Sequence, residues 1–233
     1  MKIEVFSDVD TLANKAASFV AERARRAAEE RDRFTLAVSG GTTPWRMLEA
    51  LAGEDVPWGA LEVIQVDERV APAGDPDRNL THLRESLLSH APLRAEQIRA
   101  MPVEDSDLQA AASRYASGLV DIAGSPAVLD LVHLGLGSDG HTASLIPGDP
   151  VLDVDTVDVA VTGTYQGHRR MTLTYPILNR ARQILWLVTG TSKADMLLRL
   201  RNGDRSIPSG RITGERAIVF ADVAAAARLN GQS

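Results

Sequence analysis

The sequence predicts an α/β protein built on a mainly parallel β-sheet with helices on both faces. Two observations lead to this prediction. Short apolar runs recur along the chain, and stretches with apolar residues at helical spacing separate them. This alternation is typical of βαβ units, whose crossover helices cover both faces of a parallel sheet.

The elements follow one another in a regular order, which predicts a three-layer, Rossmann-like arrangement, and the length of 233 residues allows one large domain or two small ones. The first predicted helix is rich in alanine and has one charged face. The second opens with Pro44, a residue favoured in the first turn of a helix. Asp105 or Ser106 is expected to cap the fourth helix. The predicted strands are residues 1–6, 34–38, 61–66, 127–137, 157–162, 170–175, 183–190 and 217–222, and the predicted helices are residues 10–31, 44–52, 77–90, 105–123, 192–201 and 223–230.

Composition excludes several classes of function. The chain has no cysteine, which rules out disulfides, iron–sulfur clusters, cysteine-ligated zinc and a cysteine nucleophile. The N-terminus lacks the apolar segment of a signal peptide, and no apolar run is long enough for a membrane span, so we expect a cytoplasmic protein with no membrane partner. The net charge of −6 argues against a general nucleic-acid partner, although it allows a local basic pocket.

Glycine-rich and polar loops follow several predicted strands, and in a parallel sheet these loops meet at one edge. The loop after residues 34–38 reads Ser39, Gly40, Gly41, Thr42 and Thr43, directly before a helix. Glycines let backbone N–H groups face an anion, and a helix N-terminus adds its dipole. The pattern favours a phosphate site over a tight turn with a threonine cap.

Charged residues follow two other predicted strands and begin a third. Asp67 and Arg69 should share one side of an extended segment while Glu68 faces away, and this pair suits a polar substrate. Taken alone, however, the run is more typical of a solvated strand end. Lys193, at the start of a helix, fits either a phosphate ligand or a surface lysine. Arg170 is a further cationic candidate, although a pair of arginines such as 169–170 is more typical of an exposed edge.

Residues 133–148 read HLGLGSDGHTASLIPG and contain G-x-G-x-x-G, the pattern of a dinucleotide-binding turn. A crossover helix must follow such a turn, but Pro147 and Pro150 would end any helix after about two turns. The alternative is a glycine-permitted turn that presents Asp139 and His141. A histidine can take a proton from water near neutral pH, and a carboxylate can orient its ring.

Two other uses of the histidines and serines find little support. A metal site from Asp139, His141 and His133 is conceivable, but His133 sits within an apolar strand and is predicted to be a core residue. Ser144 lacks the G-x-S-x-G turn of a serine nucleophile. The residues alone therefore do not favour a metal site or a serine nucleophile.

Six motifs together resemble the 6-phosphogluconolactonases. They are SGGTTP, VDERVAPAGDPDRNLTHLRESLL, LGLGSDGHTASLIPG, RMTLTYPILNRAR, LVTGTSKADML and IPSGRI, in that order between residues 36 and 212. His133 departs from the family pattern, where an aliphatic residue is usual. The resemblance implies a single domain over residues 1–233, with the fold type of glucosamine-6-phosphate deaminase and ribose-5-phosphate isomerase. It also implies hydrolysis of 6-phospho-D-glucono-1,5-lactone in the oxidative pentose phosphate pathway, without a cofactor.

The resemblance leads to a hypothesis for the site. The substrate phosphate rests on the loop of residues 39–43 and on Lys193, with Arg170 as a weaker candidate. His141 is the general base, and Asp139 or Asp67 orients the imidazole or the water. Arg69 binds the phosphate or stabilises the oxyanion. The expected protein is a monomer or a small homo-oligomer whose partner is this sugar-phosphate lactone.

Two alternatives stay open at this point. Glucosamine-6-phosphate deaminases share the Ser-Gly-Gly, Asp-Glu and Asp-Gly-His loops, but they carry a glutamate shortly after the histidine, where residues 142–147 read TASLIP. Ring opening and amine chemistry need that extra carboxylate, whereas lactone hydrolysis does not. Non-catalytic sugar-phosphate-binding effector domains use related folds, but they should carry a DNA-binding helix-turn-helix, for which this chain shows no segment.

Overall fold

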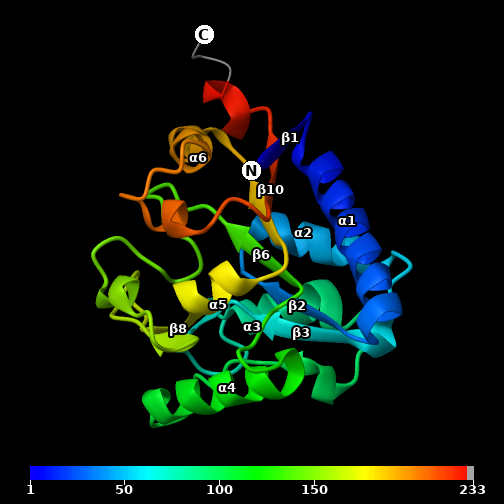
Figure 1. Ribbon diagram of the computed structural model, residues 1–233, viewed down its shortest axis with the longest axis vertical. Helices are drawn as coiled ribbons and strands as arrows, with labels where there is room; N and C mark the ends of the chain where they lie inside the picture. The colour runs from blue at the N-terminus through cyan, green and yellow to red at the C-terminus, as the bar shows by residue number, and fades with distance from the viewer. Residues whose placement is uncertain (230–233) are drawn as a thin grey trace.

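A parallel β-sheet runs through the centre of the protein, as a computed structural model describing residues 1–229 shows (Figure 1). Its neighbouring strands pair in parallel throughout, which confirms the predicted sheet. The strands lie in the order β1 (Lys2–Phe6), β10 (Ala217–Asp222), β9 (Ile184–Val188), β6 (Leu131–Gly135), β2 (Phe34–Val38), β3 (Leu61–Gln65) and β5 (Ile98–Arg99).

Helices cover both faces of this sheet, so the predicted three layers are present. On one face lie α1 (Val9–Arg31), α2 (Thr42–Ala52) and α3 (Asn79–Leu83), the last extended by a π-helical turn, Arg84–Leu88. On the other lie α4 (Leu108–Ala123), α5 (Tyr175–Arg180) and α6 (Ala194–Arg201). Short 3₁₀ helices occupy Trp58–Ala60, Ala95–Gln97, Pro150–Asp153, Thr191–Lys193, Pro208–Arg211 and Ala225–Arg228.

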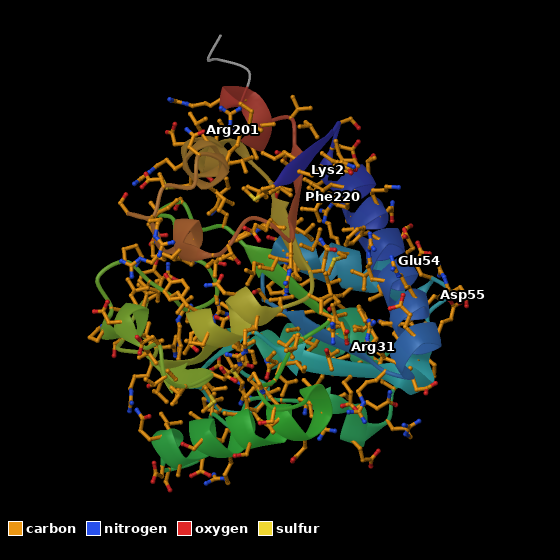
Figure 2. The ribbon with its side chains drawn as sticks, viewed as in Figure 1. Lys2, Arg31, Glu54, Asp55, Arg201 and Phe220 are labelled. Atoms are coloured by element: carbon orange, nitrogen blue, oxygen red, sulfur yellow. The ribbon has the colours of Figure 1, made fainter. Side chains whose placement is uncertain are left out.

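Aromatic side chains join the edge of the sheet to α1. Phe220 of β10 packs edge-on against Phe6 of β1 and Phe19 of α1, with ring centroids 5.1 and 5.7 Å away. Figure 2 shows Phe220 where these elements meet, and Glu54 and Asp55 beside α1. Glu54 accepts a hydrogen bond from Ser18 of that helix. A fully buried phenylalanine such as Phe220 contributes about 1.5–3 kcal/mol to stability.

A second, antiparallel sheet of β4 (Asp67–Arg69), β8 (Arg170–Leu173) and β7 (Val159–Val161) stands beside the first. Its register pairs Arg69 with Arg170. The interpretation of residues 67–69 as a solvated strand end is therefore wrong, since Glu68 is fully buried and Asp67 is 5% exposed. The exposed-edge interpretation is also wrong for Arg170, which is 4% exposed, while Arg169 is exposed.

Several helices begin or end at residues other than those predicted from the sequence. Helix α2 begins at Thr42, two residues before Pro44, and Gly41 rather than a threonine is its N-cap. The cap of α4 is Asp107, whose carboxylate accepts from the N–H groups of residues 109 and 110, so the prediction of Asp105 or Ser106 is wrong. The predicted closing helix is a short 3₁₀ turn, Ala225–Arg228, and residue 230 lies outside the described part.

The strand order reverses direction between β2 and β6. From β2 the chain proceeds to β3 on one side, whereas from β6 it proceeds to β9 on the other. At such a point the loops leaving the two strands diverge and open a crevice beyond their carboxyl ends. The loops after β2 and β6 are the Ser-Gly-Gly-Thr-Thr and Asp-Gly-His loops, so the topology brings the two strongest sequence motifs together.

Candidate functional site

A cavity of about 310 Å³ lies at this reversal point. The loops after β2, β6 and β9 form its walls together with the strands β4 and β8. Every predicted site residue lines it except Asp139, which is hydrogen-bonded to His141. The lining residues from the prediction are Ser39, Gly40, Gly41, Thr42, Thr43, Asp67, Arg69, His141, Arg170 and Lys193.

The N-terminus of α2 opens onto the cavity. Gly41, at φ 130°, caps the helix without a side-chain hydrogen bond. Gly41, Thr42 and Thr43 line the cavity at the start of the helix, and a helix N-terminus in such a position suits an anion. Thr43 shares a hydroxyl hydrogen bond of 2.7 Å with Thr189, which ties the loop after β2 to the loop after β9.

His133 holds the start of the loop after β2 through two hydrogen bonds with Ser39. The Ser39 N–H donates to His133 Nδ1 at 3.3 Å, and Ser39 Oγ donates to the His133 backbone oxygen at 3.1 Å. His133 is fully buried, as predicted, and burial lowers its pKa to about 3. The ring is therefore neutral, and because Nδ1 accepts from Ser39, the proton sits on Nε2.

Gly40 permits a close approach between the loop after β2 and α3. A Cβ at this position would lie 1.9 Å from Asn79 Oδ1, well inside van der Waals contact. Asn79 in turn donates from Nδ2 to the Asp67 backbone oxygen at 2.9 Å. Sequence reasoning missed Asn79, because only the folded chain brings it against Gly40.

Glu68 stabilises the cavity wall formed by Asp67 and Arg69, because its carboxylate binds several neighbouring backbone and side-chain donors. It faces away from the cavity, as the alternation of an extended segment predicts, and its buried carboxylate accepts four hydrogen bonds. The donors, each at 2.8 Å, are Gln65 Nε2 and the backbone N–H groups of Arg69, Asn79 and Leu80. Arg78 Nε lies 3.4 Å away and supplies a compensating charge. Sequence reasoning named Glu68 but gave it no role.

His141 and Asp139 form a hydrogen-bonded pair. His141 Nδ1 lies 2.6 Å from Asp139 Oδ1, and the His141 backbone N–H donates to the same oxygen at 3.1 Å. Partial burial raises the pKa of the Asp139 carboxyl, but the backbone hydrogen bond, charge and ring hydrogen bond of His141 outweigh it and hold that pKa below its usual value. Asp67 instead accepts from Ser144 Oγ at 2.7 Å. Of the two aspartates considered, Asp139 therefore contacts the imidazole.

Two glycines of the G-x-G-x-x-G segment leave the space that this conformation of the Asp139–His141 loop needs. A Cβ at Gly137 would lie 2.2 Å from His141 Nδ1. Gly140 adopts φ 86°, and a Cβ there would lie 2.7 Å from Ile207 Cβ. No helix follows, because residues 142 and 145 form an antiparallel bridge and turns continue to the 3₁₀ helix at Pro150. The segment therefore lacks the crossover helix of a dinucleotide site.

Three cationic side chains face the cavity. Burial lowers the pKa of the Arg170 guanidinium, and the charge of Arg69 lowers it further. Burial also lowers the pKa of Lys193, against the opposing effect of Asp139. Within residues 1–229, the buried Nε atoms of Arg69 and Arg170 have no hydrogen-bond partner. This wall therefore carries positive charge, which suits an anionic ligand.

The described residues show neither a metal cluster nor a membrane helix. Within residues 1–229, no group of three or more His, Asp and Glu side chains is placed to hold a metal ion. Over the same residues, no helix has the length and apolar character that crossing a membrane requires.

Comparison with known proteins fits this geometry. A model of the family described as glucosamine-6-phosphate isomerases/6-phosphogluconolactonase matches residues 7–220. The chain belongs to this family. The resemblance seen in the sequence motifs is therefore confirmed over most of the chain.

Relatives with the lactonase name align along nearly the whole chain. A 6-phosphogluconolactonase from Synechocystis is 36% identical over 200 residues, which cover 84% of this chain and 83% of that protein. A 6-phosphogluconolactonase from Nostoc is 33% identical over 237 residues, 98% of each chain. The two alignments therefore cover most of this chain and most of each relative.

Solved structures confirm the predicted fold type. A 6-phosphogluconolactonase from Shewanella baltica superposes with a TM-score of 0.84 at 25% identity, covering 95% of this chain and 97% of that one. A monomeric glucosamine-6-phosphate deaminase superposes with a TM-score of 0.83 at 20% identity, covering 97% and 99%. Because the fold accommodates both proteins, the choice between them depends on the site residues.

Proposed function

We propose that the protein hydrolyses 6-phospho-D-glucono-1,5-lactone to 6-phospho-D-gluconate. The observation that carries this proposal is the His141–Asp139 pair at a cavity whose other walls are a helix N-terminus and a set of cationic side chains. A phosphorylated sugar fits such a cavity with its phosphate on the cationic walls and its reacting carbon toward the histidine. The lactonase names of the full-length relatives support the same substrate.

His141 acts as the general base. The ionised Asp139 carboxylate accepts from Nδ1, so the Nδ1 atom carries the ring proton and Nε2 has the free lone pair. His141 Nε2 removes a proton from water, and the water oxygen forms a bond to C1 of the lactone. The bond from C1 to the ring oxygen then breaks, and the imidazolium returns its proton to that oxygen. Asp139 stabilises the imidazolium between the two steps.

The phosphate provides the anchor. The first-turn N–H groups of α2, Lys193 and Arg170 together offer the charge and the donors for it. Binding energy at this remote group positions C1 for attack. Two roles fit Arg69, and kinetics separates them: replacing a phosphate ligand raises KM, whereas replacing an oxyanion donor lowers kcat.

The absence of a carboxylate after His141 distinguishes the lactonase from the deaminase. Residues 142–147 contain no acid, and in the cavity Asp67 is already hydrogen-bonded to Ser144. Lactone hydrolysis needs one base and an oxyanion donor, which this site can supply. Amine elimination and ring opening need a further acid or base, so they fit the site less well.

A direct assay tests the proposal. The purified protein is mixed with freshly prepared 6-phosphogluconolactone, acid release is followed, and the spontaneous hydrolysis rate is subtracted. We expect rapid hydrolysis, and no ammonia from glucosamine 6-phosphate in a parallel assay. Ammonia release together with a lactone rate equal to the spontaneous one would favour the deaminase.

A further inference from the structure

A tight hairpin turn at residues 163–168 reaches the site from the small antiparallel sheet. Tyr165 N donates to the His168 oxygen at 2.9 Å, and His168 N donates to the Tyr165 oxygen at 3.2 Å. Between them, Gln166 and Gly167 adopt φ values of 50° and 85°, so the two central residues of the turn are both left-handed. The turn thus fixes the direction in which Tyr165 leaves the backbone.

His168 ties this turn to the segment that follows β4. Its Nε2 lies 3.0 Å from Asp77 Oδ2, and its Nδ1 lies 3.3 Å from the Val70 backbone oxygen. Arg69 donates to the Asp77 backbone oxygen, so the same loop also contacts the cationic wall. The hairpin turn is therefore anchored through His168, which helps to hold the Tyr165 side chain in place.

Tyr165 contacts three residues of the proposed machinery. Its hydroxyl donates to Asp139 Oδ2 at 3.2 Å. Its ring lies edge-on to His141, with centroids 5.8 Å apart. The Arg170 guanidinium stands over the same ring, 5.1 Å from its centroid. One side chain therefore joins the carboxylate and imidazole to the proposed phosphate ligand.

The contact with Asp139 completes the coordination of that carboxylate. Oδ1 accepts from His141 Nδ1 and His141 N, and Oδ2 accepts from Tyr165. Partial burial raises the pKa of the Tyr165 phenol, and the Asp139 charge raises it further, so the hydroxyl remains a donor near neutral pH. Hydrogen bonds at both oxygens restrain the carboxylate in the orientation that suits the imidazole.

We propose that Tyr165 is a positioning residue for the hydrolysis, holding Asp139 so that His141 keeps its productive orientation. The inference rests on the proposed function and names a part of the site that the Asp-Gly-His motif does not contain. Tyr165 lies 24 positions after His141 in the sequence and reaches it only through the fold.

The test compares Tyr165→Phe with the wild type under saturating and limiting 6-phosphogluconolactone. The variant keeps the ring beneath Arg170 and loses only the hydroxyl. We expect kcat to fall about tenfold, as for the loss of a hydrogen bond to a charged group, with KM within twofold. Tyr175→Phe is the matched control, because it loses one hydroxyl hydrogen bond, to the Pro208 oxygen, and its kcat should stay within twofold.

A double-mutant cycle separates positioning from general structural damage. If Tyr165 acts through Asp139, then Tyr165→Phe should change kcat less than twofold in an Asp139→Asn background. An unchanged kcat in the single variant, a loss confined to KM, or an equal loss in both backgrounds would overturn the inference while leaving the proposed function intact. A wild-type protein that does not accelerate lactone hydrolysis would overturn both.

Discussion

Replacing Glu68 with glutamine tests the structural basis of the site wall. The change preserves size and shape but converts one carboxylate oxygen to an NH2 group. Each carboxylate oxygen accepts two hydrogen bonds. Oε1 accepts from the backbone N–H groups of Arg69 and Asn79, and Oε2 accepts from Gln65 Nε2 and the Leu80 N–H. Whichever way the new amide is turned, its NH2 group therefore faces two donors and accepts from neither.

The magnitude follows from these contacts. Each buried donor left without an acceptor costs about 1–3 kcal/mol. The loss of the carboxylate also leaves the buried Arg78 without its nearest opposite charge, as Glu104 is 3.5 Å from another nitrogen and largely exposed. We expect Glu68→Gln to lower the free energy of unfolding by about 3–5 kcal/mol.

Urea unfolding with linear extrapolation measures this loss. Glu62→Gln is the matched control on the adjacent strand β3, where the carboxylate pairs with the part-exposed Arg99 at 2.9 Å. That control should lose no more than about 1 kcal/mol. A Glu68→Gln protein within about 1 kcal/mol of the wild type would refute the reasoning, because it would mean that the four hydrogen bonds are not needed.

Three further substitutions probe the cavity. Lys193→Ala should raise KM at least about tenfold with the thermal midpoint unchanged, because a charged phosphate ligand is lost; an unchanged KM would remove Lys193 from the phosphate site. Gly40→Ala should displace Asn79 and lower both stability and kcat/KM, measured by thermal unfolding and steady-state kinetics; wild-type values would contradict the close approach. His133→Leu should raise KM, because it removes the acceptor for the Ser39 N–H. His133→Asn keeps an acceptor, so its KM should stay close to the wild-type value in the same assay. Equal KM values for the two variants would contradict this role of His133.

Much of the sheet could be predicted because its strands are buried on both faces. Residues 34–38 and 184–188 are buried throughout, so their apolar runs stand out from the amphipathic helices between them. Of the short strands, β7 and β8 were predicted, whereas β4 and β5 were not. Strand β4 has the sequence Asp-Glu-Arg, and only its pairing with β8 makes it extended.

The same contrast applies to the site. The loops after β2 and β6 carry glycines directly after buried strands, and parallel strands bring such loops to one edge, so their convergence could be predicted. Asn79 and Tyr165 could not, because each reaches the cavity through contacts between distant segments. Glu68 was misjudged because a run of three charged residues gives no local sign that one of them is fully buried.

The activity of His141→Ala on 6-phosphogluconolactone tests the central claim most directly. With spontaneous hydrolysis subtracted, we expect kcat to fall by about 10²-fold or more, because proton removal from water loses its base. KM and the thermal midpoint should stay close to the wild-type values, since the imidazole is partly exposed and the phosphate contacts remain. Near-wild-type turnover by a folded His141→Ala protein would contradict the assignment of His141 as the base.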